Sequence, residues 1–179
     1  MPDDRKGMGL NVFDAIRTRR SIRRYKAQLV EQKKLDQVVE AGRLAPSAKN
    51  LQPWHFVLVT DGEQRRALRA AYASDWFVGA PAILVACGDP SVAWRRMDGE
   101  EYWKVDVSIA MENMVLAARE LGLGTCWIGA FDEKAAKTAL KVPDGVRVLA
   151  MTPIGYPDEE KGEVKNRKTV EEILHRETW

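Results

Sequence analysis

The hydrophobic positions of the chain recur at two spacings, which predict alternating helices and strands. From 31 to 45 apolar residues return every three to four positions, the period of an amphipathic helix. Shorter apolar runs at 55–60, 82–87 and 146–154 have the length of strands, and turn-forming residues flank them. Because the run at 82–87 shows no alternation, we expect both of its faces to be covered. This order of elements predicts an α/β or α+β protein built in layers.

The longest helical pattern extends from 105 to 121. Between Ile109 and Ala118 only Glu112 and Asn113 are polar, so this helix has no clear solvent-facing side. A helix that is apolar nearly all round is buried. In a chain this short, we expect part of its surface to lie against a second copy of the chain.

Capping residues predict four shorter helices. Asn11 followed by Asp14 is typical of a helix start, and residues 63–72 predict a surface helix. An aspartate at the first position predicts a helix over 132–140, and Thr169 predicts a last short helix near the end of the chain.

Length and composition limit the class of protein. The 179 residues, 45% of them hydrophobic, predict one domain at 11–179 behind a flexible lead-in at 1–10. The chain has no apolar run of about 18 residues and no apolar signal-peptide core. Cys87 and Cys126 lie far apart in apolar surroundings, which favours buried thiols in a reducing compartment. We therefore expect a soluble cytoplasmic protein.

Five arginines lie within the nine positions of 17–25. Their guanidinium groups have the forked geometry that binds phosphate. The run is compatible with a solvated basic face, a nucleic-acid patch or a clamp on one phosphate of a cofactor. A net charge of +2 is close to neutral and weakens the nucleic-acid interpretation, which expects basic residues spread along a groove.

Several reaction classes lack their usual residues. His55 and His175 are the only histidines, no serine lies in a nucleophile elbow, and neither a P-loop nor a Rossmann glycine motif is present. We expect no metal site. Cations that bind phosphate, together with amides that bind a heterocycle, would instead suit a cofactor that performs the chemistry. The segments that offer such groups are 19–23, 46–54, 124–131 and 165–168.

Four motifs carry a resemblance to a known family. They are Arg-Arg-Ser-Ile-Arg-Arg-Tyr at 19–25, Pro-Ser-Ala-Lys-Asn-Leu-Gln-Pro-Trp at 46–54, Gly-Leu-Gly-Thr-Cys-Trp-Ile-Gly-Ala-Phe at 122–131, and Ile-Gly-Tyr-Pro at 154–157 followed by Lys-Asn-Arg-Lys at 165–168. In this order and spacing the chain resembles the FMN-dependent nitroreductases from Asn11 to Leu174. The resemblance implies an α+β fold with three α/β/α layers and a central, mostly antiparallel sheet. It also implies an interlocked homodimer, joined through the long helix, whose two FMN sites take residues from both chains.

The resemblance also implies which residues would bind FMN. The phosphate and nearby ribityl oxygens would be held by Arg19, Arg20, Ser21 and Arg23, and from the C-terminal loop by Arg167 and Lys165. The ring or ribityl chain, in part that of the partner subunit, would contact Pro46, Ser47, Ala48 and Asn50. The segment passing along the ring, with a backbone N–H toward flavin N5, would be Ile128, Gly129 and Ala130.

Some positions depart from the family pattern or fit a substrate pocket. Gly129 stands where many relatives carry Glu, and Lys49 where many carry a small hydroxyl residue. Lys49 would either favour an anionic reduced flavin or point to solvent. Residues 88–104 are typical of a lid or binding loop. The aromatic residues of this segment would either line the substrate pocket or pack within the lid or an interface; they are Trp94, Tyr102 and Trp103. Lys49 would also line that pocket.

The function implied by the resemblance is that of an FMN-dependent oxidoreductase. It would take a hydride from NAD(P)H and reduce a small electron-poor acceptor such as a nitroaromatic or a quinone. No catalytic side chain is expected, because the flavin carries the chemistry. One alternative is a specialised flavin enzyme of the same fold, a reductive dehalogenase or a flavin-cleaving enzyme. The other is a flavin-binding or nucleic-acid-binding module without turnover. We expect neither nucleic acid nor a membrane as a partner.

Overall fold

The structure, a computed structural model, describes residues 10–179. The flexible lead-in predicted at 1–10 therefore lies, apart from Leu10, outside the described residues. The strands are β1 (Trp54–Val59), β2 (Ala82–Gly88), β3 (Gly124–Thr125) and β4 (Arg147–Gly155). The α-helices are α1 (Val12–Thr18), α2 (Gln32–Arg43), α3 (Gly62–Ala67), α4 (Asp75–Val78), α5 (Trp103–Glu120) and α6 (Glu133–Leu140). Two 3₁₀ turns are η1 (Ala48–Asn50) and η2 (Leu68–Ala70).

The four strands form one antiparallel sheet in the order β1-β2-β4-β3. All seven residues of β2 are buried, as the unbroken apolar run predicts. Strand β2 pairs with β1 from Trp54–Gly88 to Val59–Ile83 and with β4 on its other side, where a bulge at Ala86 and Cys87 shifts the register. The predicted antiparallel sheet is confirmed.

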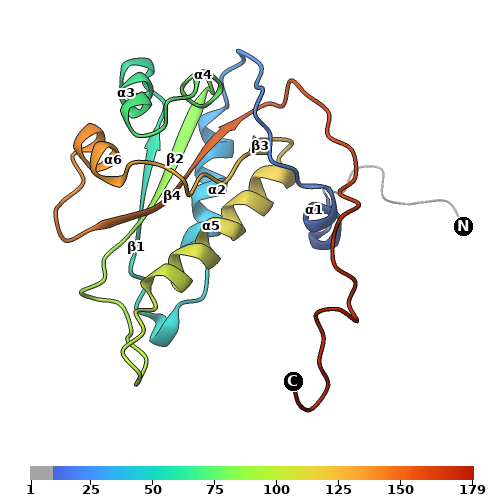
Figure 1. Ribbon diagram of the computed structural model, residues 1–179. Coiled ribbons are helices and arrows are strands. Elements are labelled where there is room, and N and C mark those ends of the chain that lie inside the picture. Colours follow the sequence, from blue (N-terminus) through green and yellow to red (C-terminus); the bar gives the residue numbers. More distant parts are fainter. Residues whose placement is uncertain (1–9) are drawn as a thin grey trace, which may run out of the picture.

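Successive residues of β2 enter two separate cores, because side chains alternate across a strand. Leu84 and Ala86 join the residues of α2 and α5, whereas Ile83 and Val85 join a second core with Phe77. Figure 1 shows α2 and α5 along one face of the sheet and α3, α4 and α6 toward the other. The three-layer α/β/α arrangement predicted from the sequence is thus confirmed.

Helices α2 and α5 pack closely because a glycine lies at their contact. A Cβ atom on Gly42 would lie only 2.7 Å from Met114 Sδ. The fully buried residues of α5, among them Val107 and Met111, face α2 and the sheet. Burial of α5 is incomplete within one chain, because Val105 and Ile109 remain 42% and 36% exposed. The expectation that a second copy covers part of this helix stays a prediction.

Local capping signals predict helix starts well where the helix also packs. Asn11 Oδ1 accepts the Asp14 N–H at 3.0 Å at the start of α1, and Asp132 Oδ1 accepts the Ala135 N–H at 3.0 Å at the start of α6. The last predicted helix is wrong: only a turn follows Thr169. The reciprocal Thr169–Glu172 hydrogen bonds do form, at 2.6 and 3.3 Å, but the residues around them are exposed. Without tertiary packing, a segment this short does not form a stable helix.

Two other predicted elements are shorter than expected. The surface helix predicted at 63–72 is divided into α3 and η2. The strand predicted within 124–131 is reduced to β3, followed by an isolated bridge between Ile128 and Met151. Within residues 10–179, we find no helix whose length and apolar character would let it span a bilayer.

Candidate functional site

The basic segment at 19–25 leaves α1 in extended conformation at Arg19 and lies beside β3, to which an isolated bridge joins it. The Ile22 N–H donates to the Thr125 carbonyl at 2.8 Å, and Ser21 forms a bridge with Thr125. Ile22 is only 6% exposed and packs on Gly124, where a Cβ atom would lie 2.8 Å from Ile22 Cγ1. Since side chains alternate in an extended segment, burying Ile22 directs Ser21 and Arg23 to the opposite side.

Arginines from both ends of the chain line one cavity, which we call the arginine cavity. It has a volume of about 570 Å³. Its lining consists of Ile16, Arg17, Arg19, Arg20, Glu112, Glu163, Val164 and Arg167. The structure therefore brings together three residues predicted to bind a phosphate: Arg19, Arg20 and Arg167.

A neighbouring cavity shares two of these arginines. It has a volume of about 460 Å³, and besides Arg19 and Arg20 its lining includes Arg119 and Lys161. Sequence reasoning missed Arg119 and Lys161. A lone cation at a helix end or in a loop carries no local signal, and only the fold places these two beside the arginine run.

Arg19 and Arg20 differ in how firmly they are bound within the chain. The Arg20 guanidinium donates to the carbonyls of Arg17, Arg19 and Gly162 at 2.7–2.8 Å, so it ties the end of α1 to the C-terminal segment. Among the residues that the structure describes, the Arg19 guanidinium makes one loose ion pair, with 3.8 Å between its Nε and Glu112 Oε1. Burial raises the pKa of Glu112, and Arg19 partly opposes that shift. Arg19 is thus the cation more readily available to a ligand.

Three other predicted phosphate ligands, Ser21, Arg23 and Lys165, line neither cavity. The Arg23 guanidinium lies 5.8 Å from the centre of the Trp76 ring, and the Arg23 N–H donates to Glu159 Oε1 at 2.6 Å. This backbone hydrogen bond is the main cause that lowers the pKa of Glu159. Lys165 is exposed and lines neither cavity. The structure of one chain does not bring Arg23 and Lys165 to the arginine cavity.

The segment predicted to pass along the flavin ring has one backbone donor already in use. The Ile128 N–H donates to the Met151 carbonyl at 2.8 Å, and the Met151 N–H donates back at 3.0 Å. Gly129 and Ala130 are exposed, and a Cβ atom on Gly129 would meet nothing within 4 Å. A donor toward flavin N5 would therefore come from Gly129 or Ala130 rather than from Ile128.

The loop at 46–52 holds three non-glycine residues in the left-handed region. Their φ angles are 52° for Lys49, 55° for Asn50 and 49° for Gln52. Each costs roughly 1–2 kcal/mol in an L-residue. Ser47 Oγ accepts the Gln52 N–H at 2.9 Å and stabilises the turn from within. Strain of this kind is concentrated at functional sites.

This loop and the arginine cavity lie on different parts of α5. None of the residues at 46–52 lines either cavity that holds Arg19. The loop is attached to α5 at Asp106, whereas the cavity uses Glu112, six residues further along. Six residues place these two side chains about 9 Å and roughly 120° apart on the helix. Figure 1 accordingly shows α1 beside the C-terminal half of α5. One chain does not bring the loop to its own arginine cavity.

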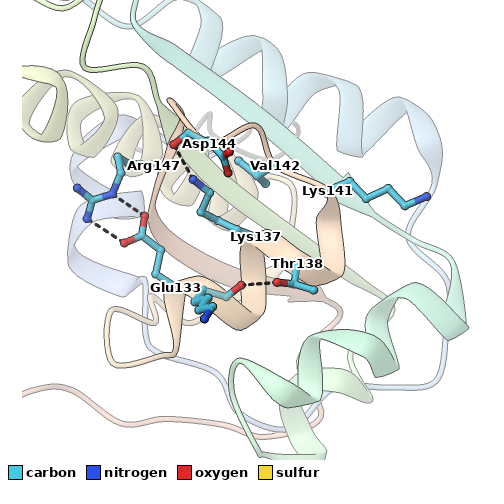
Figure 2. A pocket seen from close by; sticks show the side chains of 8 residues that line it. Glu133, Lys137, Thr138, Lys141, Val142, Asp144 and Arg147 are labelled. Atoms are coloured by element: carbon cyan, nitrogen blue, oxygen red, sulfur yellow. Dashed lines mark hydrogen bonds and ion pairs between the residues drawn. The ribbon is translucent and has the colours of Figure 1, made fainter.

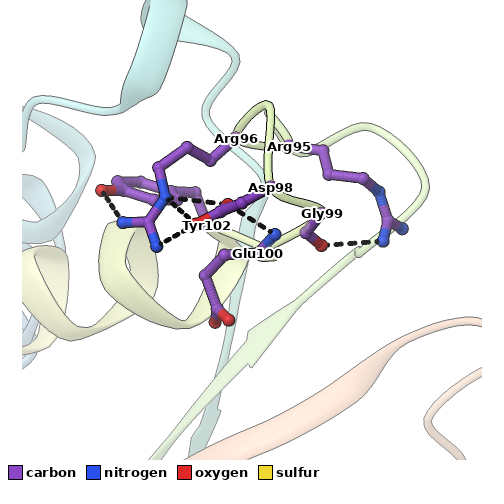
Figure 3. A network of polar contacts seen from close by, with 6 residues as sticks. All are labelled: Arg95, Arg96, Asp98, Gly99, Glu100 and Tyr102. Carbon is purple, nitrogen blue, oxygen red and sulfur yellow. Dashed lines mark hydrogen bonds and ion pairs between the residues drawn. The ribbon is translucent and has the colours of Figure 1, made fainter.

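Residues 89–102 form a compact hairpin held by charged groups (Figure 3). Arg95 Nη2 donates to Glu101 Oε1 at 2.7 Å, and Arg96 makes hydrogen bonds of 2.6–2.9 Å to both oxygens of Asp98. These bonds from Arg96 are the main cause that lowers the pKa of Asp98. The segment predicted as a lid is thus ordered by its own contacts.

The three aromatic residues predicted for a substrate pocket occupy two different environments. Trp94 and Tyr102 pack edge to face, 4.7 Å apart, within the hairpin. Trp103 begins α5, is 2% exposed and fills the space over Gly88, where a Cβ atom would lie 2.7 Å from its ring. The structure therefore places Trp103 in the core, where it cannot line a pocket.

A separate hollow of about 590 Å³ lies between α6 and β4 (Figure 2). One ion pair and one hydrogen bond from a lysine to a backbone carbonyl lie within it. Glu133 binds Arg147 through two hydrogen bonds of 2.8 Å, which are the main cause that lowers the pKa of Glu133, and Lys137 Nζ donates to the Asp144 carbonyl at 2.9 Å. No residue of the predicted flavin site lines this hollow, so its polar contacts join α6 to β4.

Comparison with known proteins identifies the family of the chain. Residues 16–85 and 66–156 match the Nitroreductase family. The chain belongs to the nitroreductase family. Among curated relatives of this nitroreductase, a "Putative NADH dehydrogenase/NAD(P)H nitroreductase" from Archaeoglobus fulgidus is 37% identical in an alignment of 171 residues that covers 92% of this chain and 96% of that protein.

Solved structures agree with this assignment and with the fold. A nitroreductase family protein from Clostridium difficile 630 superposes with a TM-score of 0.88 at 28% identity, over 95% of this nitroreductase and all of that chain. A protein described as an FMN-dependent nitroreductase from Clostridium difficile R20291 is 33% identical with a TM-score of 0.81, over 92% of this chain and 98% of that one. The resemblance inferred from four motifs is confirmed.

Proposed function

We propose that this nitroreductase is an FMN-dependent oxidoreductase that takes a hydride from NAD(P)H and reduces a small electron-poor acceptor such as a nitroaromatic or a quinone. The descriptions of its relatives as an NAD(P)H nitroreductase and an FMN-dependent nitroreductase support the proposal. The observation that carries it is the arginine cavity, in which Arg19 and Arg20 meet Arg167 from the far end of the chain.

The residues present suit FMN. Guanidinium groups bind phosphate through paired N–H donors. Within residues 10–179 the ion pair of Arg19 is loose, and its cavity of about 570 Å³ is large enough for a phosphate and part of a ribityl chain. The exposed, unobstructed Gly129 leaves space for a flat ring. Bound FMN would supply the ring that accepts the hydride and passes electrons on.

The side chains would bind and orient rather than transfer protons. Arg19 and Arg167 would neutralise the phosphate, while Arg20 keeps the C-terminal segment in place through the Gly162 carbonyl. Ile22 packs on Gly124, and this contact holds the basic segment with its arginines beside β3. Gly129 and Ala130 would present a backbone edge to the ring. Lys165 and Arg23 remain proposed ligands that need a shift of their side chains to reach the phosphate.

The same geometry supports a homodimer with sites composed of two chains. Helix α1 exposes Val12, Phe13 and Ile16 at 59%, 71% and 52%, and α5 exposes Val105 and Ile109. Such apolar surface is typical of an interface. Because the loop at 46–52 does not reach the arginine cavity of its own chain, its ring contacts would be made to the flavin of the partner subunit. A cytoplasmic location stays a prediction.

The proposal is tested by loading the purified protein with FMN and adding NADH or NADPH without oxygen. We expect the protein to bind FMN and its oxidised-flavin absorbance to bleach with at least one of the two nucleotides. Addition of a quinone should then restore the absorbance. A protein that cannot be loaded with FMN would contradict the proposal, and a loaded protein that neither nucleotide bleaches would contradict the NAD(P)H-dependent activity.

A further inference from the structure

The strained loop at 46–52 is attached to the core by one buried carboxylate. Asp106 lies in the first turn of α5 and is 1% exposed. Its Oδ1 accepts the Ala48 N–H at 3.0 Å, immediately before the left-handed residues Lys49 and Asn50. Among residues 10–179, the other oxygen, Oδ2, is buried and has no hydrogen-bond partner.

The buried carboxyl group of Asp106 has a cost in folding free energy. Burying a charged group with an oxygen left without a donor disfavours folding, and an apolar residue would pack without that cost. The hydrogen bond that Asp106 does make joins a backbone N–H to a carboxyl oxygen, and a bond of this kind is stronger with a carboxylate than with a neutral acceptor. It acts on a loop whose backbone is strained at three residues and therefore tends to relax.

We propose that Asp106 is a positioning residue, which holds the turn at Lys49 and Asn50 in its left-handed conformation and thereby presents these side chains to the flavin site. The proposal rests on the proposed function for the identity of that site. The restraint is a hydrogen bond between two residues of the same chain, Ala48 and Asp106, so it can be measured without cofactor. Ser47 closes the turn internally through Gln52, whereas Asp106 fixes the whole turn relative to α5.

The test is tryptic cleavage of the cofactor-free protein at the Lys49–Asn50 bond, followed by mass spectrometry. Cleavage at Lys141–Val142 is the internal reference, because Lys141 is also exposed and also left-handed, with φ 54°. We expect Asp106→Ala to speed cleavage at Lys49 relative to Lys141 by at least about tenfold. Cleavage follows the population of the opened loop, and one charge-assisted hydrogen bond changes that population by about this factor.

Two variants separate positioning from a general loss of stability. Asp106→Asn keeps an oxygen that accepts from Ala48, so we expect it to stay within about threefold of the unmodified protein. Asn113→Ala is the matched control, since Asn113 also lies on α5 and donates to the Ala41 carbonyl before the loop at 3.3 Å. It should leave the cleavage ratio unchanged. If Asp106→Ala does not fold, Asp106→Ser removes the carboxylate but keeps a polar group, and we expect the same acceleration.

A second readout links the restraint to the site. In the FMN-loaded enzyme, Asp106→Ala should raise the KM for the acceptor more than it lowers kcat, and Asp106→Asn should restore the KM. Equal cleavage ratios for Asp106→Ala and Asn113→Ala would overturn the positioning role even if FMN binds normally. If the unmodified protein fails to bind FMN while Asp106→Ala still shows the accelerated cleavage, the proposed function is overturned and the restraint is established.

Discussion

Arg19 and Glu112 face each other in the arginine cavity, 3.8 Å apart. A phosphate that binds Arg19 must compete with this carboxylate and lies close to its negative charge. We therefore predict that Glu112→Gln strengthens FMN binding by roughly two- to fivefold, the scale of one partly exposed ion pair. Glu120→Gln, on the same helix but outside both cavities, is the control and should leave the affinity unchanged. Titration of flavin fluorescence measures both variants.

The pH dependence of this effect follows from the direction of the Glu112 shift. Burial raises the pKa of Glu112, so its carboxylate becomes neutral earlier on acidification than an ordinary glutamate. The advantage of Glu112→Gln over the unmodified protein should therefore be full above that raised pKa and vanish as the pH falls through it. An advantage that grows on acidification would show that Glu112 does not oppose the phosphate.

Among the residues predicted for the site, those in sequence motifs include three that the structure places in one cavity. Arg19, Arg20 and Arg167 come together as the motifs imply, although 147 positions separate Arg20 and Arg167 in the chain. Arg119 and Lys161 could not be found in this way, because their only signal is the fold. The core position of Trp103 was equally hidden, since it depends on the glycine that β2 places beneath the ring.

The basic segment and β3 act as one element, joined where Ile22 packs on Gly124. A methyl group on Gly124 would lie 2.8 Å from Ile22 Cγ1, whereas one on Gly129 would meet nothing within 4 Å. We predict that Gly124→Ala lowers the free energy of unfolding by about 1–3 kcal/mol through overpacking and weakens FMN binding. Gly129→Ala, its matched control, should change the free energy by less than about 0.5 kcal/mol. Chemical denaturation measures the free energy of unfolding of both variants. Equal losses for Gly124→Ala and Gly129→Ala would contradict the packing of Ile22 on Gly124.

At the scale of elements, prediction succeeded where local and tertiary signals agree. The caps at Asn11 and Asp132 start helices that also pack on the molecule. Thr169 has the same local signal, and its capping hydrogen bonds form, yet no helix follows because Val170 and Ile173 remain 61% and 63% exposed. The left-handed turn at 49–50 was not predictable, since its restraint comes from Asp106, which lies far along the chain.

At the scale of the whole molecule, the exposed apolar residues of α1 and α5 would form the interface of the proposed dimer. Phe13 is 71% exposed and Ile109 is 36% exposed. We predict that Phe13→Glu combined with Ile109→Glu shifts the protein from dimer to monomer in sedimentation velocity and weakens FMN binding, because each site would lose the loop of the partner subunit. Leu29→Glu replaces a residue that is 74% exposed on neither helix and should leave the dimer intact. A dimer that survives the double substitution would place the interface elsewhere.

The central claim is that the arginine cavity binds the phosphate of FMN, and riboflavin, which lacks that phosphate, tests it most directly. Affinities for FMN and riboflavin are measured for the unmodified protein, for Arg19→Ala with Arg167→Ala, and for the control Arg24→Ala, whose guanidinium donates to the Asp158 carbonyl outside the cavity. We predict a strong preference for FMN that the control keeps. The double variant should lose FMN affinity by about 3 kcal/mol or more, the scale of two charge-assisted contacts, while its riboflavin affinity barely changes. An undiminished preference for FMN in the double variant would show that the phosphate binds elsewhere.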